Sequence, residues 1–147
     1  MNSIAVRTAL ALGLVAGTVA AVMAQAGGSI NLTVTSLRND NGSVRCGLYN
    51  SAGAFPQAGH ESRGVIAPIS GRQAMCVFRD VAPGTYAIAF FHAEQNETRM
   101  QQGLFGKPTE GYGFSNNASG SFGPPSFSDA AFDYRGGKRS MQARVQY

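Results

Sequence analysis

The chain has few of the residue types from which many binding and catalytic sites are built. Its 147 residues include no tryptophan, two cysteines and 14% charged residues. The cysteines stand far apart in the sequence, so the C-x-x-C spacing of zinc sites is absent. The basic residues are scattered, and the only local cluster, Arg135, Lys138 and Arg139, flanks Gly136-Gly137 as in a solvated hairpin turn. A nucleic-acid surface needs a denser basic patch with interleaved aromatics, so no nucleic-acid partner is expected.

Long apolar runs are also scarce, and the one present lies at residues 9–22. It is about 14 residues long, short of the roughly 20 that span a bilayer. Arg7 precedes the run, Val22-Met23-Ala24 follows it with residues that suit a signal peptidase, and no lipobox cysteine is found there. We therefore predict a signal peptide at 1–24, cleaved near 24–26, and an exported protein of the periplasm or extracellular space. No membrane span is expected after cleavage; an uncleaved N-terminal anchor is the alternative.

The two cysteines, Cys46 and Cys76, fit an exported protein. In an oxidising compartment, a cysteine pair in a small domain usually forms a disulfide. Each cysteine alternates in phase with apolar residues of its segment, which places both toward the core. Such a bond would contribute roughly 3 to 4 kcal/mol on the chain-entropy model. Two free buried thiols are the alternative.

The rest of the chain shows the period-two alternation of β-strands and no helical periodicity. Turn-forming residues separate the apolar segments, for example at Asn39–Gly42, which we interpret as a hairpin turn. The pattern predicts one all-β domain, residues 25–147, folded as an antiparallel β-sandwich of about seven strands. The alternating segments lie at 30–35, 44–49, 74–78, 86–91 and 141–147, and a further segment, 64–69, follows a looser stretch that contains Pro56 and Gly59.

One segment, from Ala93 to Pro125, breaks this rhythm because it shows no strand pattern. Loops of this length in a small domain are uncommon, and ordered ones are often functional. Aromatic residues recur through its second half and just beyond. They either bind a ligand at the surface or turn inward and hold the loop in place, and we favour the inward orientation. These aromatics are Tyr112, Phe114, Phe122, Phe127 and Phe132.

Three segments carry a resemblance to a known family. They are A-P-G-T-Y-A-I-A at 82–89 followed by His92, G-K-P-T-E-G-Y-G-F-S-N-N at 106–117, and G-P-P-S-F-S-D-A at 123–130. Together they resemble domain-of-unknown-function family 2141, a family of small exported bacterial proteins. The resemblance implies a transthyretin-like or immunoglobulin-like β-sandwich with no established activity.

The chain departs from that family after His92. Family members typically carry a segment similar to H-D-x-N-x-N-G-x-x-D, whose alternating oxygen ligands resemble a calcium loop. Here Ala93 and Gln101 stand where the first and last acids are expected, and Arg99 adds a positive charge. No metal or cofactor is therefore expected, although a structural module with a degenerate calcium loop remains one alternative function.

A catalytic alternative also exists. His92 precedes Glu94, a carboxylate that could orient the imidazole for acid–base work, with Glu110 as a further acid. The simpler interpretation is a strand-end histidine hydrogen-bonded to the long loop. No G-x-S-x-G elbow marks an activated serine. The candidate ligand-binding or loop-anchoring residues are His92, Glu94, Glu110, Tyr112, Phe114, Ser115, Asn116, Asn117 and Asp129.

The function that these observations favour is that of a non-enzymatic binding or cell-envelope accessory module. Its partner would be a small molecule or an envelope component, which the sequence does not identify. A hydrolytic enzyme that uses His92, Glu94 and Glu110 is the rival interpretation.

Overall fold

The computed structural model describes residues 27–101 and 108–147, and these residues form an all-β fold, as predicted. The predicted signal peptide lies outside the described residues. No helix in the described part of the chain is long and apolar enough to cross a membrane. The strands are β1 (Gly28–Thr35), β2 (Ser43–Tyr49), β3 (Arg63–Ser70), β4 (Gln73–Val81), β5 (Gly84–Ala93), β6 (Tyr112–Phe114), β7 (Phe132–Tyr134) and β8 (Lys138–Arg144), with two helical turns, η2 (Ser115–Asn117) and α1 (Phe127–Ala130).

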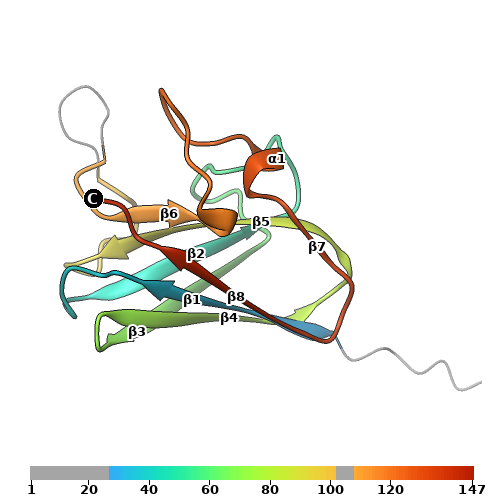
Figure 1. Cartoon of the computed structure of the whole chain (residues 1–147), viewed down its shortest axis with the longest axis horizontal. Helices are drawn as coiled ribbons and strands as arrows, with labels where there is room; N and C mark the ends of the chain where they lie inside the picture. Colours follow the sequence, from blue (N-terminus) through green and yellow to red (C-terminus); the bar gives the residue numbers. More distant parts are fainter. Residues whose placement is uncertain (1–26, 102–107) are drawn as a thin grey trace, which may run out of the picture.

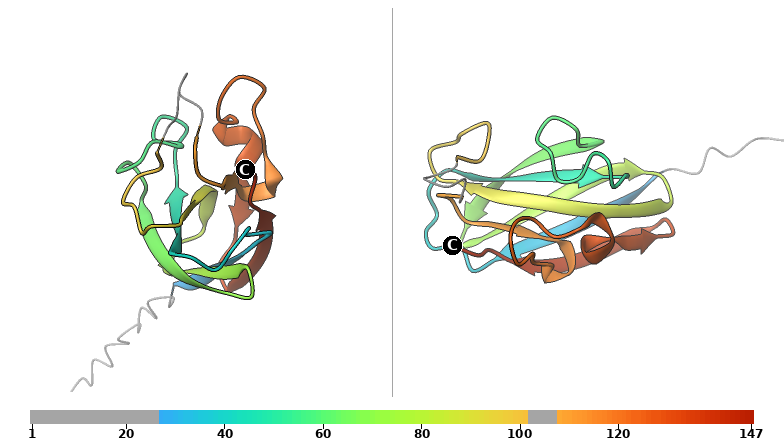
Figure 2. Two further views of the ribbon diagram at one scale, coloured as in Figure 1. Left: turned by 90° about the vertical axis from the view of Figure 1, so that its left-hand side faces the viewer. Right: turned by 90° about the horizontal axis from the view of Figure 1, so that it is seen from above.

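The strands form one eight-stranded sheet in the order β6-β5-β2-β3-β4-β1-β8, with β7 paired to β5 off this path. The sheet curls around the core (Figure 2), and an isolated bridge between Tyr112 and Gln146 brings its two ends together. It is therefore nearly closed into a barrel. The finer prediction of a sandwich of transthyretin or immunoglobulin type is not confirmed.

Two expectations about strand pairing are wrong. The sheet is not purely antiparallel, because β1 and β8 run parallel from Ser29↔Lys138 to Thr35↔Arg144. Asn39–Gly42 does not close a hairpin, because β1 pairs with β4 and β8 whereas β2 pairs with β3 and β5. The bend at Gly136-Gly137 likewise joins two strands that pair elsewhere. Turn residues reveal a change of direction but not which strands become neighbours.

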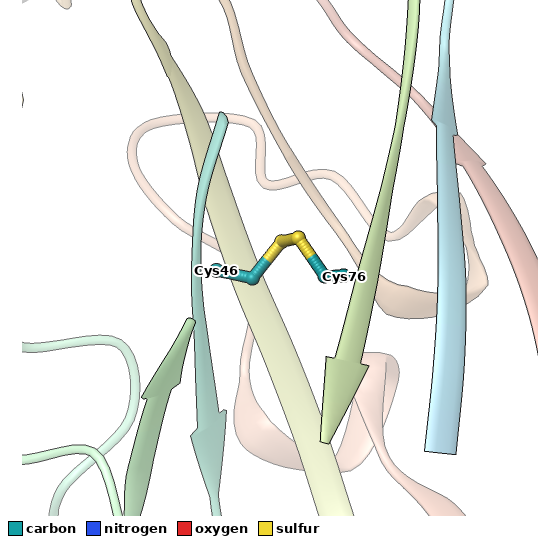
Figure 3. Close-up of a disulfide and its surroundings, with 2 residues drawn as sticks. All are labelled: Cys46 and Cys76. Atoms are coloured by element: carbon teal, nitrogen blue, oxygen red, sulfur yellow. A yellow bond between two sulfur atoms is a disulfide. The ribbon is translucent and has the colours of Figure 1, made fainter. Parts of the chain in front are cut away.

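The cysteine prediction is confirmed by a disulfide between Cys46 and Cys76. It joins β2 to β4 (Figure 3), two strands separated by β3 in the sheet order, with 6.4 Å between their Cα atoms. β3 pairs with β4 only at Ile69↔Ala74 and Ser70↔Gln73, so the strands diverge beyond that hairpin. The disulfide therefore links the two sides of the sheet across the core, where both cysteines are buried.

β5 is a strand with apolar residues on both faces. Ile88 and Phe90 point into the main core, whereas Ala87 belongs to a second apolar cluster on the opposite face. That cluster includes Phe55, from the connection between β2 and β3, and Ala130 of α1, so segments outside the main sheet path help to cover this face. Figure 1 shows these segments, including α1, above β5.

Two short strands were missed in the sequence. β6 lies inside the segment where no strand pattern was found, and β7 follows it closely; each has three residues. Three residues cannot display a period of two convincingly. β6 pairs with β5 on one side, and β7 pairs with the first residues of β5. Both strands therefore depend on pairing with β5 rather than on a local pattern.

Removing the disulfide should destabilise the protein strongly. We expect the Cys46→Ala/Cys76→Ala variant to lose about 3 kcal/mol or more of unfolding free energy, because the closed loop restricts the unfolded chain and the lost sulfurs leave a cavity. Urea denaturation measures the change, and wild type with reductant should lose a similar amount. Two alkylatable thiols in the unreduced, denatured protein would contradict the bond itself.

Candidate functional site

The candidate residues nearest to one another lie where β5 ends. His92 follows Ile88 and Phe90 in the inward phase of the strand, so its ring enters the interior, and its side chain is 0% exposed. The chain reaches the same place from the β1–β2 connection and from the C-terminus, which lies beside β6 (Figure 1). Local alternation thus orients the histidine, and distant segments supply its partners.

Both ring nitrogens of His92 are occupied. Nε2 lies 2.7 Å from the carbonyl oxygen of Asn41, and Nδ1 lies 2.8 Å from the hydroxyl of Tyr147. A carbonyl oxygen can only accept, so Nε2 donates, and in the neutral ring Nδ1 accepts from the tyrosine. A general base needs a nitrogen within reach of a substrate proton. The His92 ring is thus held by Asn41 and Tyr147 rather than by the long loop, and only the backbone N–H of His92 bonds to that loop, at Gly111.

Glu94 is held by Arg38. The guanidinium donates from Nε to one carboxylate oxygen and from Nη2 to the other, the latter at 2.6 Å, and Asn39 Nδ2 donates at 3.0 Å. These hydrogen bonds, that of Arg38 foremost, lower the pKa of Glu94 to about 2, against a smaller opposing effect of desolvation. Both oxygens of the Glu94 carboxylate are thus bonded to Arg38, so neither is free to act as a base.

Arg38 also contacts Tyr147. Its guanidinium lies over the tyrosine ring, with Cζ 4.7 Å from the centroid, and its backbone N–H donates to the tyrosine hydroxyl at 3.0 Å. Arg38, His92, Glu94 and Tyr147 thus form one connected set, which we call the His92 network. Sequence reasoning missed Arg38 and the role of Tyr147. Tyr147 was placed at the end of a predicted strand, but no local signal linked either residue to the histidine.

Glu110 lies near this network but is not bonded into it. Its neighbour Gly111 accepts a hydrogen bond from the backbone N–H of His92 at 2.8 Å. The Glu110 carboxylate is 7% exposed and accepts from the backbone N–H of Gln101 at 3.3 Å. Desolvation, and then the nearby Glu97 carboxylate, raise the pKa of Glu110, with the Gln101 hydrogen bond opposing them. The residues of the predicted catalytic alternative therefore do gather at one end of β5.

The segment at 92–101 does not assemble a metal site in this structure. Among residues 27–101 and 108–147, no group of three or more His, Cys, Asp or Glu side chains could hold a metal ion. Arg38 takes both carboxylate oxygens of Glu94, which would otherwise be the first oxygen ligands of the segment. Arg38 thus occupies the carboxylate oxygens of Glu94 that a calcium ion would need as ligands.

The second group of candidates, Ser115, Asn116 and Asn117, anchors backbone. The buried Ser115 hydroxyl accepts from Ile88 N–H at 2.9 Å and donates to the carbonyl of Ala130. Asn116 Nδ2 donates to the Ala131 carbonyl at 2.8 Å, and Asn117 Oδ1 accepts from Arg144 N–H at 2.9 Å. Both asparagines have positive φ, which this residue type tolerates. The trio therefore ties η2 to β5, to the start of β7 and to β8.

The aromatics of the long segment mostly point inward, as predicted. Phe114 and Phe132 are buried, and Tyr112 and Phe127 are partly buried against the second cluster. The prediction is wrong for Phe122, which is fully exposed. It lies between Ser121 and Gly123, in a stretch of exposed small and polar residues that offers it no apolar neighbour.

Asp129 belongs to the short helix α1. Its backbone N–H donates to the side-chain oxygen of Ser126 at 3.2 Å, which caps the first turn of the helix. The Asp129 side chain is exposed. It lies near Ser115 and Asn116 rather than beside His92, since its carbonyl lies 3.4 Å from Asn116 Nδ2. The candidates thus fall into two groups, one at each end of the β5–β6 region.

With this geometry in hand, comparison with known proteins identifies the family. A family model described as "uncharacterized protein conserved in bacteria (DUF2141)" matches residues 32–142. The chain belongs to this family. The match covers all the candidate residues, although Tyr147 of the His92 network lies outside it, and it confirms the family resemblance seen in the sequence. No curated protein and no solved structure matches the chain.

The ion pair between Glu94 and Arg38 should make the unfolding free energy depend on pH in the acidic range. Because the folded-state pKa is lowered to about 2, the contribution of Glu94 is complete above its ordinary pKa of about 4.3 and is lost as the pH falls toward 2. We expect Glu94→Gln to reduce the unfolding free energy by about 1 kcal/mol at pH 7, and by progressively less below pH 4. Urea denaturation over this pH range measures it. Asp129→Asn is the charge-matched control, and a pH-independent loss in Glu94→Gln would refute the pair's role.

The charged form of Glu110 should lower the stability of the fold, whereas the charged form of Glu94 raises it. A carboxyl with a raised folded-state pKa destabilises the fold once it is charged, so its cost grows as the pH rises from about 4.3 through the folded-state value. We expect Glu110→Gln to be more stable than wild type at pH 7 and equal to it near pH 4. Thermal denaturation at the two pH values decides this. Glu97→Gln, which removes the repelling neighbour, should give part of the same gain; a Glu110→Gln variant less stable at pH 7 would contradict the assignment.

Proposed function

We propose that this protein is exported and acts by binding an envelope component or a small molecule rather than by catalysing a reaction. The observation that carries the proposal is the occupancy of the candidate catalytic groups. Both nitrogens of His92 already have partners, and both oxygens of Glu94 face Arg38. Side chains whose donors and acceptors are already bonded within the protein stabilise the fold. They are poorly placed to accept or donate a substrate's proton.

The candidate serine supports the same conclusion. Nucleophilic serines are exposed at a turn and activated by an adjacent base. Ser115 is fully buried, and its hydroxyl is bonded to the backbone of Ile88 and Ala130. A substrate could reach it only if η2 detached from β5.

Export is supported by the disulfide. Cys46 and Cys76 are bonded in the core, and structural disulfides persist mainly in oxidising compartments such as the periplasm. The predicted signal peptide at 1–24 is a second, independent line of support. The catalytic alternative draws its support from one observation, the gathering of His92, Glu94 and Glu110 at the end of β5.

One experiment tests both halves of the proposal. The chain is expressed in a bacterium with its own first 26 residues, the cells are fractionated, and the recovered protein is assayed on esters, phosphate esters and glycosides. We expect periplasmic protein without free thiols and without steady turnover. Turnover that is abolished in His92→Gln or Glu110→Gln would establish the catalytic alternative, and a cytoplasmic protein with two reactive thiols would refute export.

A further inference from the structure

The bend between β7 and β8 borders a shallow groove that is open to solvent, at a distance from the His92 network. It has a volume of about 790 Å³ and is lined by β7, the bend, the first residues of β8, and Asn116 of η2. β7 pairs with β5 and β8 pairs with β1, so the two strands separate at the bend and leave space between them. The volume lies within the range of pockets that hold small molecules.

The lining of the groove is positively charged. Arg135, Lys138 and Arg139 face one acid, Asp133. Within residues 27–101 and 108–147, none of these three cations forms an ion pair. The Asp133 carboxylate accepts a hydrogen bond from the Thr85 hydroxyl at 3.1 Å instead. The groove thus holds three positive charges against one negative charge.

Arg139 is oriented by contacts that leave most of its donors free. One amino group, Nη1, donates to the backbone carbonyl of Asp133 at 3.0 Å. The guanidinium also lies over the ring of the buried Phe132, with Cζ 5.2 Å from the centroid. A guanidinium has five N–H donors. The remaining donors are therefore held on a fixed plane at the groove, which reduces the entropy lost when a ligand binds.

The bend that carries Arg135 and Lys138 is also fixed. Gly136 and Gly137 have φ of 100° and 71°, values that favour glycine. The carbonyl of Gly137 accepts from the hydroxyl of Tyr134 and, at 2.9 Å, from the backbone N–H of Ser29. Both cations thus project from a bend that is fastened to β1 and to β7.

We propose that this groove binds a small phosphorylated molecule, with Arg135, Lys138 and Arg139 as the residues that hold its phosphate. Guanidinium groups match phosphate oxygens in a planar, paired geometry, and an ammonium adds a third contact. A dianionic phosphate ester balances the excess charge, and the volume leaves space for the group that the phosphate esterifies. The inference rests on the proposed binding function and gives it a site and a ligand class.

The test compares two variants that remove equal charge. Arg135→Gln/Lys138→Gln alters the groove, whereas Arg99→Gln/Arg144→Gln alters two exposed arginines outside it. Arg139 is left unchanged because its guanidinium packs on Phe132. Its loss would lower stability as well as binding, and the two effects could not be separated. Thermal denaturation confirms that both variants fold, and calorimetric titration with glucose 6-phosphate in low-salt buffer measures binding.

We expect wild type and the Arg99/Arg144 variant to bind glucose 6-phosphate within about twofold of each other, and the groove variant to bind about tenfold more weakly or not at all. The wild-type affinity should fall as salt is added. Absence of binding by wild type, or equal weakening in both variants, would overturn the inference. Binding only to vesicles containing phosphatidylglycerol would also overturn it, in favour of a membrane-surface site. These outcomes leave the non-catalytic proposal untouched, because turnover decides that separately.

Discussion

The constraint on which the rest of the structure depends is the double burial of β5. A strand with apolar residues on both faces must be packed against other elements on both sides. The core inside a single curled sheet buries only the inner face. The outer face of β5 is covered by segments without long strands, which contribute Phe55, Phe114 and Ala130. The need to bury the outer face of β5 explains the length of the connection between β5 and β8. The segment is long because it must pass over β5, give it two short partners, and continue to β1.

Such a cover is costly to order, because each fixed backbone residue loses about 1 to 2 kcal/mol of conformational entropy. The inward aromatics offset part of this cost by burial. Ser115, Asn116 and Asn117 add the directional contacts that aromatics lack, since each bonds to backbone of a different part of the fold. The segment by which the family is recognised therefore has a structural explanation that does not involve a ligand. This segment has an architectural role.

The parts of the fold that could be predicted are those encoded locally. Alternation located five of the six longer strands, all but β3, and oriented Cys46 and Cys76 inward. Partner choice was not predictable, because β1 reaches β8 across most of the chain and nothing local specifies that pairing. For the same reason Arg38 and Tyr147 could not be linked to His92 in advance. Phe122 shows the converse limit: it is a phenylalanine like the buried Phe114 and Phe132, but only the path of the chain decides whether a ring reaches the core.

The parallel pairing of β1 with β8 also affects the order of folding. β1 lies between β4 and β8, and its register with β8 joins residues more than a hundred positions apart, from Ser29↔Lys138 to Thr35↔Arg144. The first strand of the domain therefore stays unpaired along one edge until the last strand has been made. Contacts of such long range slow folding, because the loop between them must be closed before they form. A chain of this design cannot complete its sheet until β8 is available to pair with β1.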